Sequence, residues 1–569
     1  MVRKSIYILC MLSALSLASC VDLDLNPPSS ASSENWYSDA DEITISINDF
    51  YREYLYALES DWWTDRRTDD WAQREEIYEF VVGNVTSEWS ASENFWINSY
   101  KGISRVNRVV EAIDALEQAG TVAETTLTQL RAEALFFRAF FYSRLINTFG
   151  AVPFYTAGID LDEARLMGRT DVATIQEQIY SDFDYAIQNL PVDNSSSGFT
   201  RVGRGAAMAL KARIALYQED WEVARDAAKA CMDLGVYSLY PDYGELFLSK
   251  QYECETIFMI PRSIELGHSS AVKNFMPRTS GGNAVAQPSW ELLAAYTCTD
   301  GLPIDESPLF NPRKPFENRD PRCTYTIVEH GTELNGYVFN PHPDATTVMN
   351  YNTGKEVTNK DARSSKNPYC AYNCMQLRKG VQPEWTEQLK TENPIIIVRY
   401  ADVLLMYAEA KIELDEIDQS VLDAINDVRA RAYKVTREQT DSYPAVTTTD
   451  QTQLRRALRL ERRMEFAWEG RRFWDLKRWR WFEKAFACDY YGCLTATELK
   501  NKIIDQDLWF WPETPPVDED GFPDFTPMGD KGLIQKYVDR NFDPKTYLWP
   551  IPNEDVMISN GVLEQNDGY

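Results

Sequence analysis

Apolar side chains recur along much of this chain at the three- and four-residue spacing of an α-helix with one buried face. The first such run begins at about Asp41 and continues to Leu58. A later run ends at Phe149, where Gly150 and Pro153 supply a glycine C-cap followed by proline, a typical helix stop. The same pattern predicts further helices at about 96–110, 127–149, 173–190, 203–234, 400–414, 421–432 and 454–482.

In the run at 203–234, alanines occupy the predicted seam on both sides of a short turn at 218–220. Small side chains let two helices pack closely, as in a tetratricopeptide hairpin. The strict period of about 34 residues that defines that repeat is not visible, so generic helical hairpins remain the alternative. The pattern predicts an all-α fold, with a scaffold of tetratricopeptide-like helix pairs.

Two long stretches interrupt the helical pattern, at 236–395 and 487–546. They are rich in proline, glycine, asparagine, serine and aromatic residues, with only short apolar runs, which is typical of irregular, loop-rich structure. A shorter interruption at 59–93 combines tryptophan with charged residues. Loops of this length are usually functional or disordered, and the tryptophan content argues against disorder.

The N-terminus has the features of an export signal. Arg3 and Lys4 precede an apolar run at 6–18, which is too short to span a bilayer but suits a signal peptide. Small residues directly before Cys20 resemble a bacterial lipobox, in which that cysteine becomes the lipidated N-terminus; a plain cleaved signal is the alternative. The acidic segment at 21–24 resembles the surface-export signals of lipoproteins in the Bacteroidetes, which implies an outer-membrane, cell-surface, lipid-anchored protein.

We therefore expect one compact body with a cleaved leader. Its parts are a signal peptide at 1–19, a lipidated N-terminus and linker at 20–40, a helical portion at 41–235 with a loop at 59–93, an irregular portion at 236–395, a second helical portion at 396–486, and a loop insertion with a C-terminal strap at 487–569.

Charge and composition exclude several classes of function. The 87 acidic residues against 58 basic ones give a formal charge of −29, which opposes binding to nucleic acid. The three histidines, His268, His330 and His342, do not form an HxxxH or HExxH arrangement, so we expect no metal centre and no cofactor.

Cysteine is sparse in the exported part of the chain. Ten cysteines, less the one in the signal segment and Cys20, leave eight, far below the density of a disulfide scaffold. The closest pairs in sequence are Cys370 with Cys374 and Cys488 with Cys493. We expect isolated disulfides or buried thiols here and not zinc ligands.

Signatures of nucleophilic catalysis are missing from the sequence. It contains no GxSxG motif, no glycine-rich phosphate loop and no histidine beside a serine or cysteine pattern. Glycoside hydrolysis needs only two carboxylates about 5 to 9.5 Å apart, and the many acidic residues leave that alternative open.

Aromatic side chains flanked by polar ones would suit a sugar ligand. The C–H faces of a sugar stack on aromatic rings, while its hydroxyls bond to Asp, Asn and Arg side chains. The loop at 61–74 combines both kinds of residue, and Trp89 and the insertion at 330–380 could extend them into an exposed arc. The candidate ligand-binding residues are Trp62, Trp63, Arg66, Asp69, Asp70, Trp71, Arg74, Trp89, Tyr337, Tyr351 and Asn352.

Four blocks of sequence, in order, resemble the SusD/RagB family of outer-membrane nutrient-binding lipoproteins. They are the helix from Arg131 to Pro153; Asp300–Pro303 with Asn318–Arg322; Val398–Ala410 with Leu460–Trp479; and Leu548–Pro552 with Gln565–Tyr569. The resemblance runs from Cys20 to Tyr569 and departs at Asp567, where the family more often has proline.

The resemblance implies a SusD-like scaffold that binds an oligosaccharide or polysaccharide and delivers it to a SusC-like TonB-dependent transporter. It implies no enzymatic activity, and it leaves the ligand loops without residue-by-residue equivalents. A peptide-binding lipoprotein on the same scaffold, a surface glycosidase and a purely structural surface protein are the alternatives.

The residues of two of these blocks suggest a structural role and not a ligand-binding one. Glu461, Glu465 and Glu469 lie four residues apart on one predicted helix, where like charges repel. They therefore require nearby cations, and we expect a buried ion-pair network with Arg399, Arg462 or Arg463 in place of a carboxylate site. The segment at 549–552 is expected to form a C-terminal strap on the helices.

Overall fold

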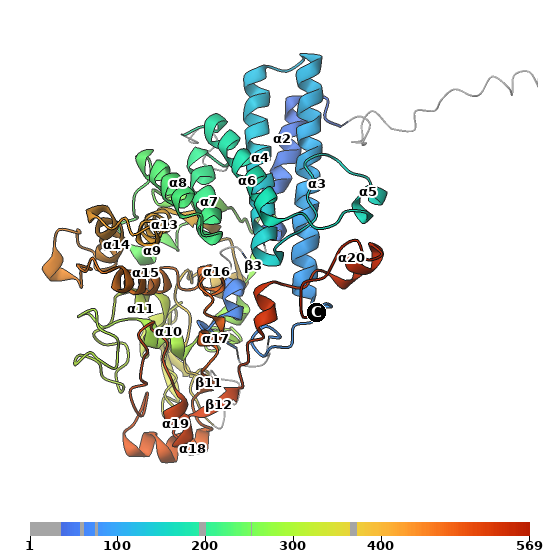
Figure 1. The fold of residues 1–569 in the computed structure, drawn as a ribbon. Coiled ribbons are helices and arrows are strands. Elements are labelled where there is room, and N and C mark those ends of the chain that lie inside the picture. The colour runs from blue at the N-terminus through green and yellow to red at the C-terminus, as the bar shows by residue number, and fades with distance from the viewer. Residues whose placement is uncertain are drawn as a thin grey trace, which may run out of the picture.

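The computed structural model describes residues 36–56, 58, 62–73, 78–192, 201–251, 253–364 and 372–569 (Figure 1). Helices dominate it, which confirms the predicted all-α class, and none of those described is long and apolar enough to cross a membrane. They are α2 (Ala40–Asn48), α3 (Ser90–Ala119), α4 (Glu124–Phe149), α5 (Leu161–Arg165), α6 (Val172–Asn189), α7 (Arg204–Tyr217), α8 (Trp221–Asp233), α9 (Tyr243–Leu246), α10 (Trp290–Ala295), α11 (Arg322–Thr326), α12 (Trp385–Gln388), α13 (Tyr400–Glu413), α14 (Gln419–Ala432), α15 (Gln451–Glu465), α16 (Arg471–Arg478), α17 (Phe482–Ala485), α18 (Ala496–Lys502), α19 (Thr526–Asp530) and α20 (Asn553–Ile558).

The longer helices pack in sequential pairs. α3 lies against α4, α4 against α6, and α7 against α8; α8 then packs on α13, which continues the row through α14 and α15 (Figure 1). Close packing of α7 on α8 follows from small side chains, since Ala224 and Ala228 of α8 and Ala209 and Ala212 of α7 are fully buried. The predicted row of tetratricopeptide-like helix pairs is therefore confirmed.

Two predicted helices are shorter than expected. The helix expected over 41–58 ends at Asn48 and continues as short 3₁₀ segments. The helix expected over 454–482 breaks after Glu465 and restarts at Arg471, because Trp468 and Gly470 adopt positive φ angles of 60° and 71°. Side chains from elsewhere donate to the carbonyl oxygens that this break frees: Arg399 and Lys379 donate to the backbone oxygens of residues 465 and 467 at 3.0 and 2.9 Å.

The strands are short and form several small antiparallel sheets. β2 pairs with β10 beneath the helices, β1 pairs with β4, β3 with β9 and β11 with β12, and β5, β6, β7 and β8 form a meander. Their bounds are β1 (Trp71–Gln73), β2 (Thr256–Ile260), β3 (Ser270–Ala271), β4 (Ala286–Pro288), β5 (Thr332–Leu334), β6 (Tyr337–Phe339), β7 (Thr347–Asn350), β8 (Lys355–Thr358), β9 (Lys390–Thr391), β10 (Ile395–Arg399), β11 (Tyr490–Gly492) and β12 (Gln535–Val538).

The molecule has two large hydrophobic cores, and α15 contributes to both. Leu454 and Leu458 belong to the core of the helical pairs, whereas Met464 belongs to the core of the irregular portion. The second core contains several tryptophans, including the fully buried Trp290 and Trp385. Figure 1 shows α18 and α19, which cover it, at the opposite end of the molecule from the α3–α4 pair.

The C-terminal segment is a strap on the helices, as predicted. The Trp549 side chain is fully buried, with its ring centroid 4.5 Å from that of Trp89 and 5.9 Å from that of Phe95. The Asn566 amide donates to the backbone oxygens of Phe149 and Trp549 at 3.0 and 2.7 Å. These contacts fasten the end of the chain to the C-terminus of α4.

Candidate functional site

The loop that the sequence proposed as an exposed aromatic surface lies largely inside the molecule. Trp71 belongs to β1, pairs with Pro288 of β4, and is 4% exposed. Its ring stacks on that of Trp468, with centroids 4.8 Å apart and planes 19° apart. The expectation that Trp71 forms part of an exposed arc is therefore wrong, because the irregular portion folds over it.

Asp69 and Asp70 are also buried, where they neutralise arginines of the second helical portion. Asp69 accepts two hydrogen bonds from Arg472 at 2.9 and 2.8 Å, and Asp70 accepts two from Arg463 at 3.0 and 2.7 Å. Burial alone would raise the pKa of Asp69, but Arg463 and Arg472 lower it to about 2. For Asp70, burial and the neighbouring charge of Asp69 outweigh Arg463 and raise the pKa. Neither carboxylate faces solvent, which corrects their expected exposure.

The remaining residues of this region divide into buried, half-buried and undescribed ones. Trp89 is 8% exposed and packs against the strap, so it does not extend an exposed arc. Trp63 is half-buried against Phe275, with ring centroids 5.0 Å apart, and the Arg66 guanidinium lies 4.9 Å from the centre of the Tyr78 ring. Arg74 and Cys20 lie outside the described residues, and the Trp62 side chain is not described.

Tyr337, Tyr351 and Asn352 come together at one end of the β5–β8 meander. Asn335 and Gly336 form the turn between β5 and β6, both with positive φ angles, as in a type I′ hairpin turn. The N–H of Tyr351 donates to the Gly336 oxygen at 2.7 Å, and the Asn352 amide donates to the Asn335 oxygen at 3.3 Å. We call this cluster of Tyr337, Tyr351 and Asn352 the hairpin tip.

The hairpin tip presents an aromatic ring to solvent. Tyr351 is 62% exposed, and among the described residues the other clearly exposed aromatic side chain is Tyr54, at 37%. Tyr337, which pairs in register with Asn350, is half-buried, and Asn352 is exposed. An open ring with a neighbouring amide can stack on a sugar face and bond to its hydroxyls. Their contact with a ligand stays a prediction.

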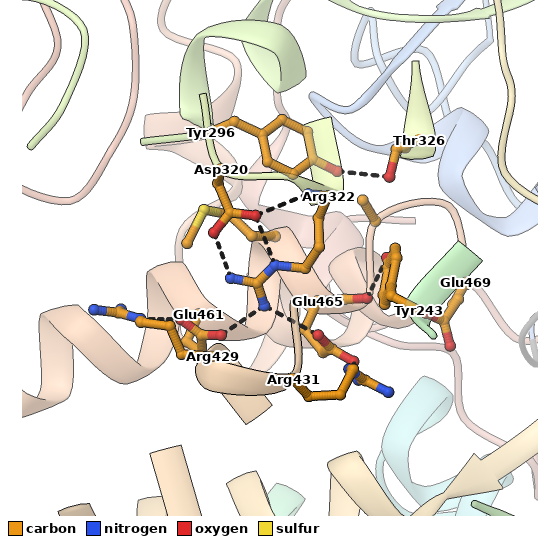
Figure 2. A network of polar contacts seen from close by, with 12 residues as sticks. Tyr243, Tyr296, Asp320, Arg322, Thr326, Arg429, Arg431, Glu461, Glu465 and Glu469 are labelled. Atoms are coloured by element: carbon orange, nitrogen blue, oxygen red, sulfur yellow. Dashed lines mark hydrogen bonds and ion pairs between the residues drawn. The ribbon is translucent and has the colours of Figure 1, made fainter. Parts of the chain in front are cut away.

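The predicted ion-pair network exists and is buried. Arg322 lies at its centre between Asp320, Glu461 and Glu465 (Figure 2). Its guanidinium is 2.8 Å from Asp320, 2.6 Å from Glu461 and 3.0 Å from Glu465. All four side chains are at most 1% exposed. The network joins α11 of the irregular portion to α15.

Arg399 extends the network toward the break between α15 and α16. It lies 2.6 Å from Glu465, 2.6 Å from Glu255 and 2.7 Å from Glu469, and Lys379 lies 2.6 Å from Glu469. The prediction of Arg399 as a partner is confirmed. Arg462 and Arg463 have other partners: Arg462 pairs with Asp402 and Asp475, and Arg463 pairs with Asp69 and Asp70.

The network has the electrostatics of a structural core and not of a reacting centre. Burial would raise the pKa of Glu465, but Arg431, Arg399 and Arg322 together hold it well below the usual range of a glutamate. A carboxylate held so firmly ionised is a poor general acid. The nearest cavity, between Lys379, Glu469 and Asn393, measures about 50 Å³, which is far smaller than a sugar site.

Two larger hollows lie on the helical scaffold, and the sequence did not indicate either. One of about 850 Å³ runs between Tyr237, Tyr400 and Arg437, where Arg437 is paired with Asp427 at 2.8 Å. The other, of about 380 Å³, lies where α16 meets the ends of α4 and α7. Lys477 lines it, and burial lowers the pKa of that lysine to about 7. Since Lys477 stands in a block assigned to scaffold, the sequence carried no signal for a hollow there.

The described residues contain no cluster of metal ligands, and two of the cysteines lie close together. Within the described ranges, no three His, Cys, Asp or Glu side chains gather as metal ligands would. Of the cysteine pairs close in sequence, Cys370 lies outside the described residues, and Cys488 Sγ accepts a hydrogen bond from the N–H of Phe525 at 3.4 Å. The sulfur of Cys493 lies 3.3 Å from that of Cys374.

Two family models match the chain. The one described as the SusD family matches residues 254–569, and the one described as "Starch-binding associating with outer membrane" matches residues 23–216. Together they cover most of both helical portions and of the irregular portion, and residues 217–253 lie between the two matches.

Relatives of similar length match as well. SusD-like protein P25 of Formosa agariphila is 25% identical over 70% of this chain and 72% of its own length. SusD-like protein P2 of the same organism is 24% identical over 98% of both chains.

Solved structures share the fold. The crystal structure of a SusD-like carbohydrate binding protein from Bacteroides fragilis has a TM-score of 0.75 and 25% identity, and covers 92% of this chain and 98% of that one. A second SusD-like protein of Bacteroides fragilis has a TM-score of 0.73 at 23% identity, and covers 95% and 99%.

Proposed function

The chain belongs to the SusD family, and on that premise we propose that it binds an oligosaccharide at the cell surface and delivers it, uncleaved, to a TonB-dependent transporter of the outer membrane. The starch-binding, outer-membrane description of the second family model supports the ligand class and the location. The carbohydrate-binding relative of known structure supports the same ligand class.

The observation that carries the proposal is the exposure of Tyr351 beside Tyr337 and Asn352. The Tyr351 ring is 62% exposed, so a large apolar surface stays in contact with water. A sugar that stacks on the ring would cover this surface. We place the sugar at the hairpin tip, with the Tyr351 ring as the stacking face and the Asn352 amide as a hydroxyl partner. An open surface of this kind binds weakly, with a Kd of about 10 µM to 1 mM.

Delivery to a transporter is inferred from the family, and weak affinity and a lipid anchor would suit it. A lipid on Cys20 would hold the protein at the membrane, and a barrel beneath it would trap the ligand between two surfaces. The net charge of −29 on the whole chain opposes binding of nucleic acid. Capture of a β-barrel with the tagged full-length protein from solubilised membranes tests this step, and repeated absence of a barrel would contradict it.

The binding step is tested on residues 21–569, free of lipid, against a panel of soluble polysaccharides, with reducing ends assayed in parallel. We expect binding without release of reducing ends. Cleavage would assign the protein to the glycosidases. Binding of a peptide pool, with no glycan bound, would replace the sugar by a peptide on the same scaffold.

A further inference from the structure

Cys374 and Cys493 meet in the second hydrophobic core although they are 119 residues apart in sequence. Their sulfur atoms lie 3.3 Å apart, and the two residues are 0% and 3% exposed. A disulfide bond needs a separation of about 2 Å between sulfurs, so a small side-chain movement closes this gap.

The backbones of both residues are held in place by hydrogen bonds. The N–H of Cys493 donates to the Tyr372 oxygen at 2.7 Å, and its own oxygen accepts from the Tyr537 hydroxyl at 2.8 Å. Directly before Cys374, the Asn373 amide donates to the Pro288 oxygen at 2.8 Å, and the Asn373 oxygen accepts from the Trp290 indole at 2.7 Å. These hydrogen bonds hold the two backbones in place, so a rotation of the side chains is enough to bring the sulfurs to bonding distance.

Cys374 also has a backbone conformation that does not favour cysteine. Its φ angle is +59°, in the left-handed region where glycine or asparagine is normally found. A residue with a Cβ is strained in this conformation and keeps it only where the surrounding structure holds it. Cysteine at this site directs its sulfur at Cys493, whereas glycine would relieve the strain and lose the contact.

We propose that Cys374 and Cys493 form a disulfide bond that fastens the irregular portion, which carries the hairpin tip, to the segment at 487–569. This inference rests on the export step of the proposed function, because disulfides persist in oxidising compartments outside the cytosol. The loop that the bond closes is long, so its effect on stability is correspondingly large.

The oxidant is a thiol–disulfide oxidoreductase in its disulfide form, met during export. One cysteine thiolate attacks a sulfur of that disulfide, which forms a mixed disulfide and releases one thiolate of the oxidant. The second cysteine, once deprotonated, attacks the protein sulfur of the mixed disulfide and releases the other thiolate. Two electrons pass to the oxidant, and the two protons of the cysteine thiols end on its thiols. Because both sulfurs are buried in the fold, the exchange precedes docking of the two segments.

The first test uses the full-length protein, exported and purified without reductant, denatured and treated with iodoacetamide. Peptide mass spectrometry is expected to find Cys374 linked to Cys493, and to find both alkylated only after prior reduction. Alkylation of both without reduction would overturn the proposal, as would a link from Cys374 to Cys370 or from Cys493 to Cys488. This readout needs no variant, so a folding defect cannot obscure it.

The second test compares thermal unfolding of Cys374→Ser, Cys493→Ser and the double variant. Each single change is expected to lower the Tm by a similar amount, and the double change by little more. Cys231→Ser is the matched control, because Cys231 is fully buried and its thiol bonds to the Gly205 oxygen. We expect reductant to lower the Tm of Cys231→Ser by as much as it lowers the Tm of the wild type. Glycan binding is measured on the same samples. If the protein binds glycan while Cys374 and Cys493 remain thiols, the disulfide proposal fails and the proposed function stands.

Discussion

Arg399 and Glu465 form an ion pair of 2.6 Å between side chains that are 2% and 0% exposed. Glu465 also faces Arg322 and Arg431, so one carboxylate serves three guanidinium groups. Removing one partner from such a pair leaves uncompensated charge in a medium of low polarity. We expect Glu465→Gln to lower the free energy of unfolding by about 3–5 kcal/mol, measured by chemical denaturation.

The matched control for this change is Glu177→Gln, an exposed glutamate in the middle of α6. Surface substitutions of this kind change stability by about 0.5 kcal/mol or less. A Glu465→Gln protein as stable as the control would show that the network contributes nothing to the fold.

The same network predicts acid sensitivity. The pKa values of Glu465 and Glu469 are lowered in the folded protein, so the unfolded chain, with glutamate pKa values of about 4.3, takes up their protons first. The stability these carboxylates supply is therefore present above about pH 5 and is lost as the pH falls below about 4. We expect the stability gap between wild type and Glu465→Gln to narrow from pH 6 to pH 3.5. A constant gap across that range would contradict the lowered pKa of Glu465.

Substitution of Trp71 tests whether this residue stabilises the fold or binds the ligand. Because its ring is buried against Trp468, Trp71→Ala is expected to cost about 3–5 kcal/mol of stability. Where the variant remains folded, its glycan affinity is expected to match that of the wild type. Denaturation and titration on one preparation measure both quantities, and a stable variant with lost affinity would restore Trp71 to the ligand surface.

The turn at the hairpin tip supplies a prediction with an internal control. A Cβ at Gly336 would lie 2.1 Å from the Asn352 amide nitrogen, whereas a Cβ at Gly354 meets nothing within 4 Å. Both glycines have positive φ angles, so alanine strains both backbones. We expect Gly336→Ala to weaken glycan binding about tenfold because it displaces Asn352, and Gly354→Ala to leave affinity nearly unchanged. Equal effects would show that backbone strain, and not Asn352, matters.

The sequence predicted the helix pairs because their burial repeats with a local period. Alanines of α7 and α8 mark a close seam without knowledge of any distant contact. The break at 466–470 was missed for the opposite reason: the carbonyls it frees are satisfied by Arg399 and Lys379, which stand far away in sequence. Only the folded chain supplies them.

The candidate site shows the same limit. Asp69, Asp70 and Trp71 have the composition of a sugar site, yet that composition also suits a buried segment paired with arginines about 400 residues later. Sequence does not distinguish the two. Tyr337, Tyr351 and Asn352 were selected on equal grounds, and their convergence depends on the Asn335–Gly336 turn and the strand register. The sequence showed only which cysteines are close along the chain, Cys370 with Cys374 and Cys488 with Cys493, and could not show that Cys374 lies beside Cys493.

The central claim, that glycan binds at the hairpin tip, is tested most directly by titrating Tyr351→Ala and Tyr54→Ala with the polysaccharide that the panel identifies. Tyr351 is 62% exposed and Tyr54 is 37% exposed with a hydrogen bond from Arg105, so thermal unfolding of both variants is measured alongside to show that each is folded. We expect the affinity of Tyr351→Ala to fall about five- to tenfold, equivalent to about 1–1.4 kcal/mol, with Tyr54→Ala unchanged. Unchanged affinity in Tyr351→Ala, with the wild type binding, would contradict the assignment of the site.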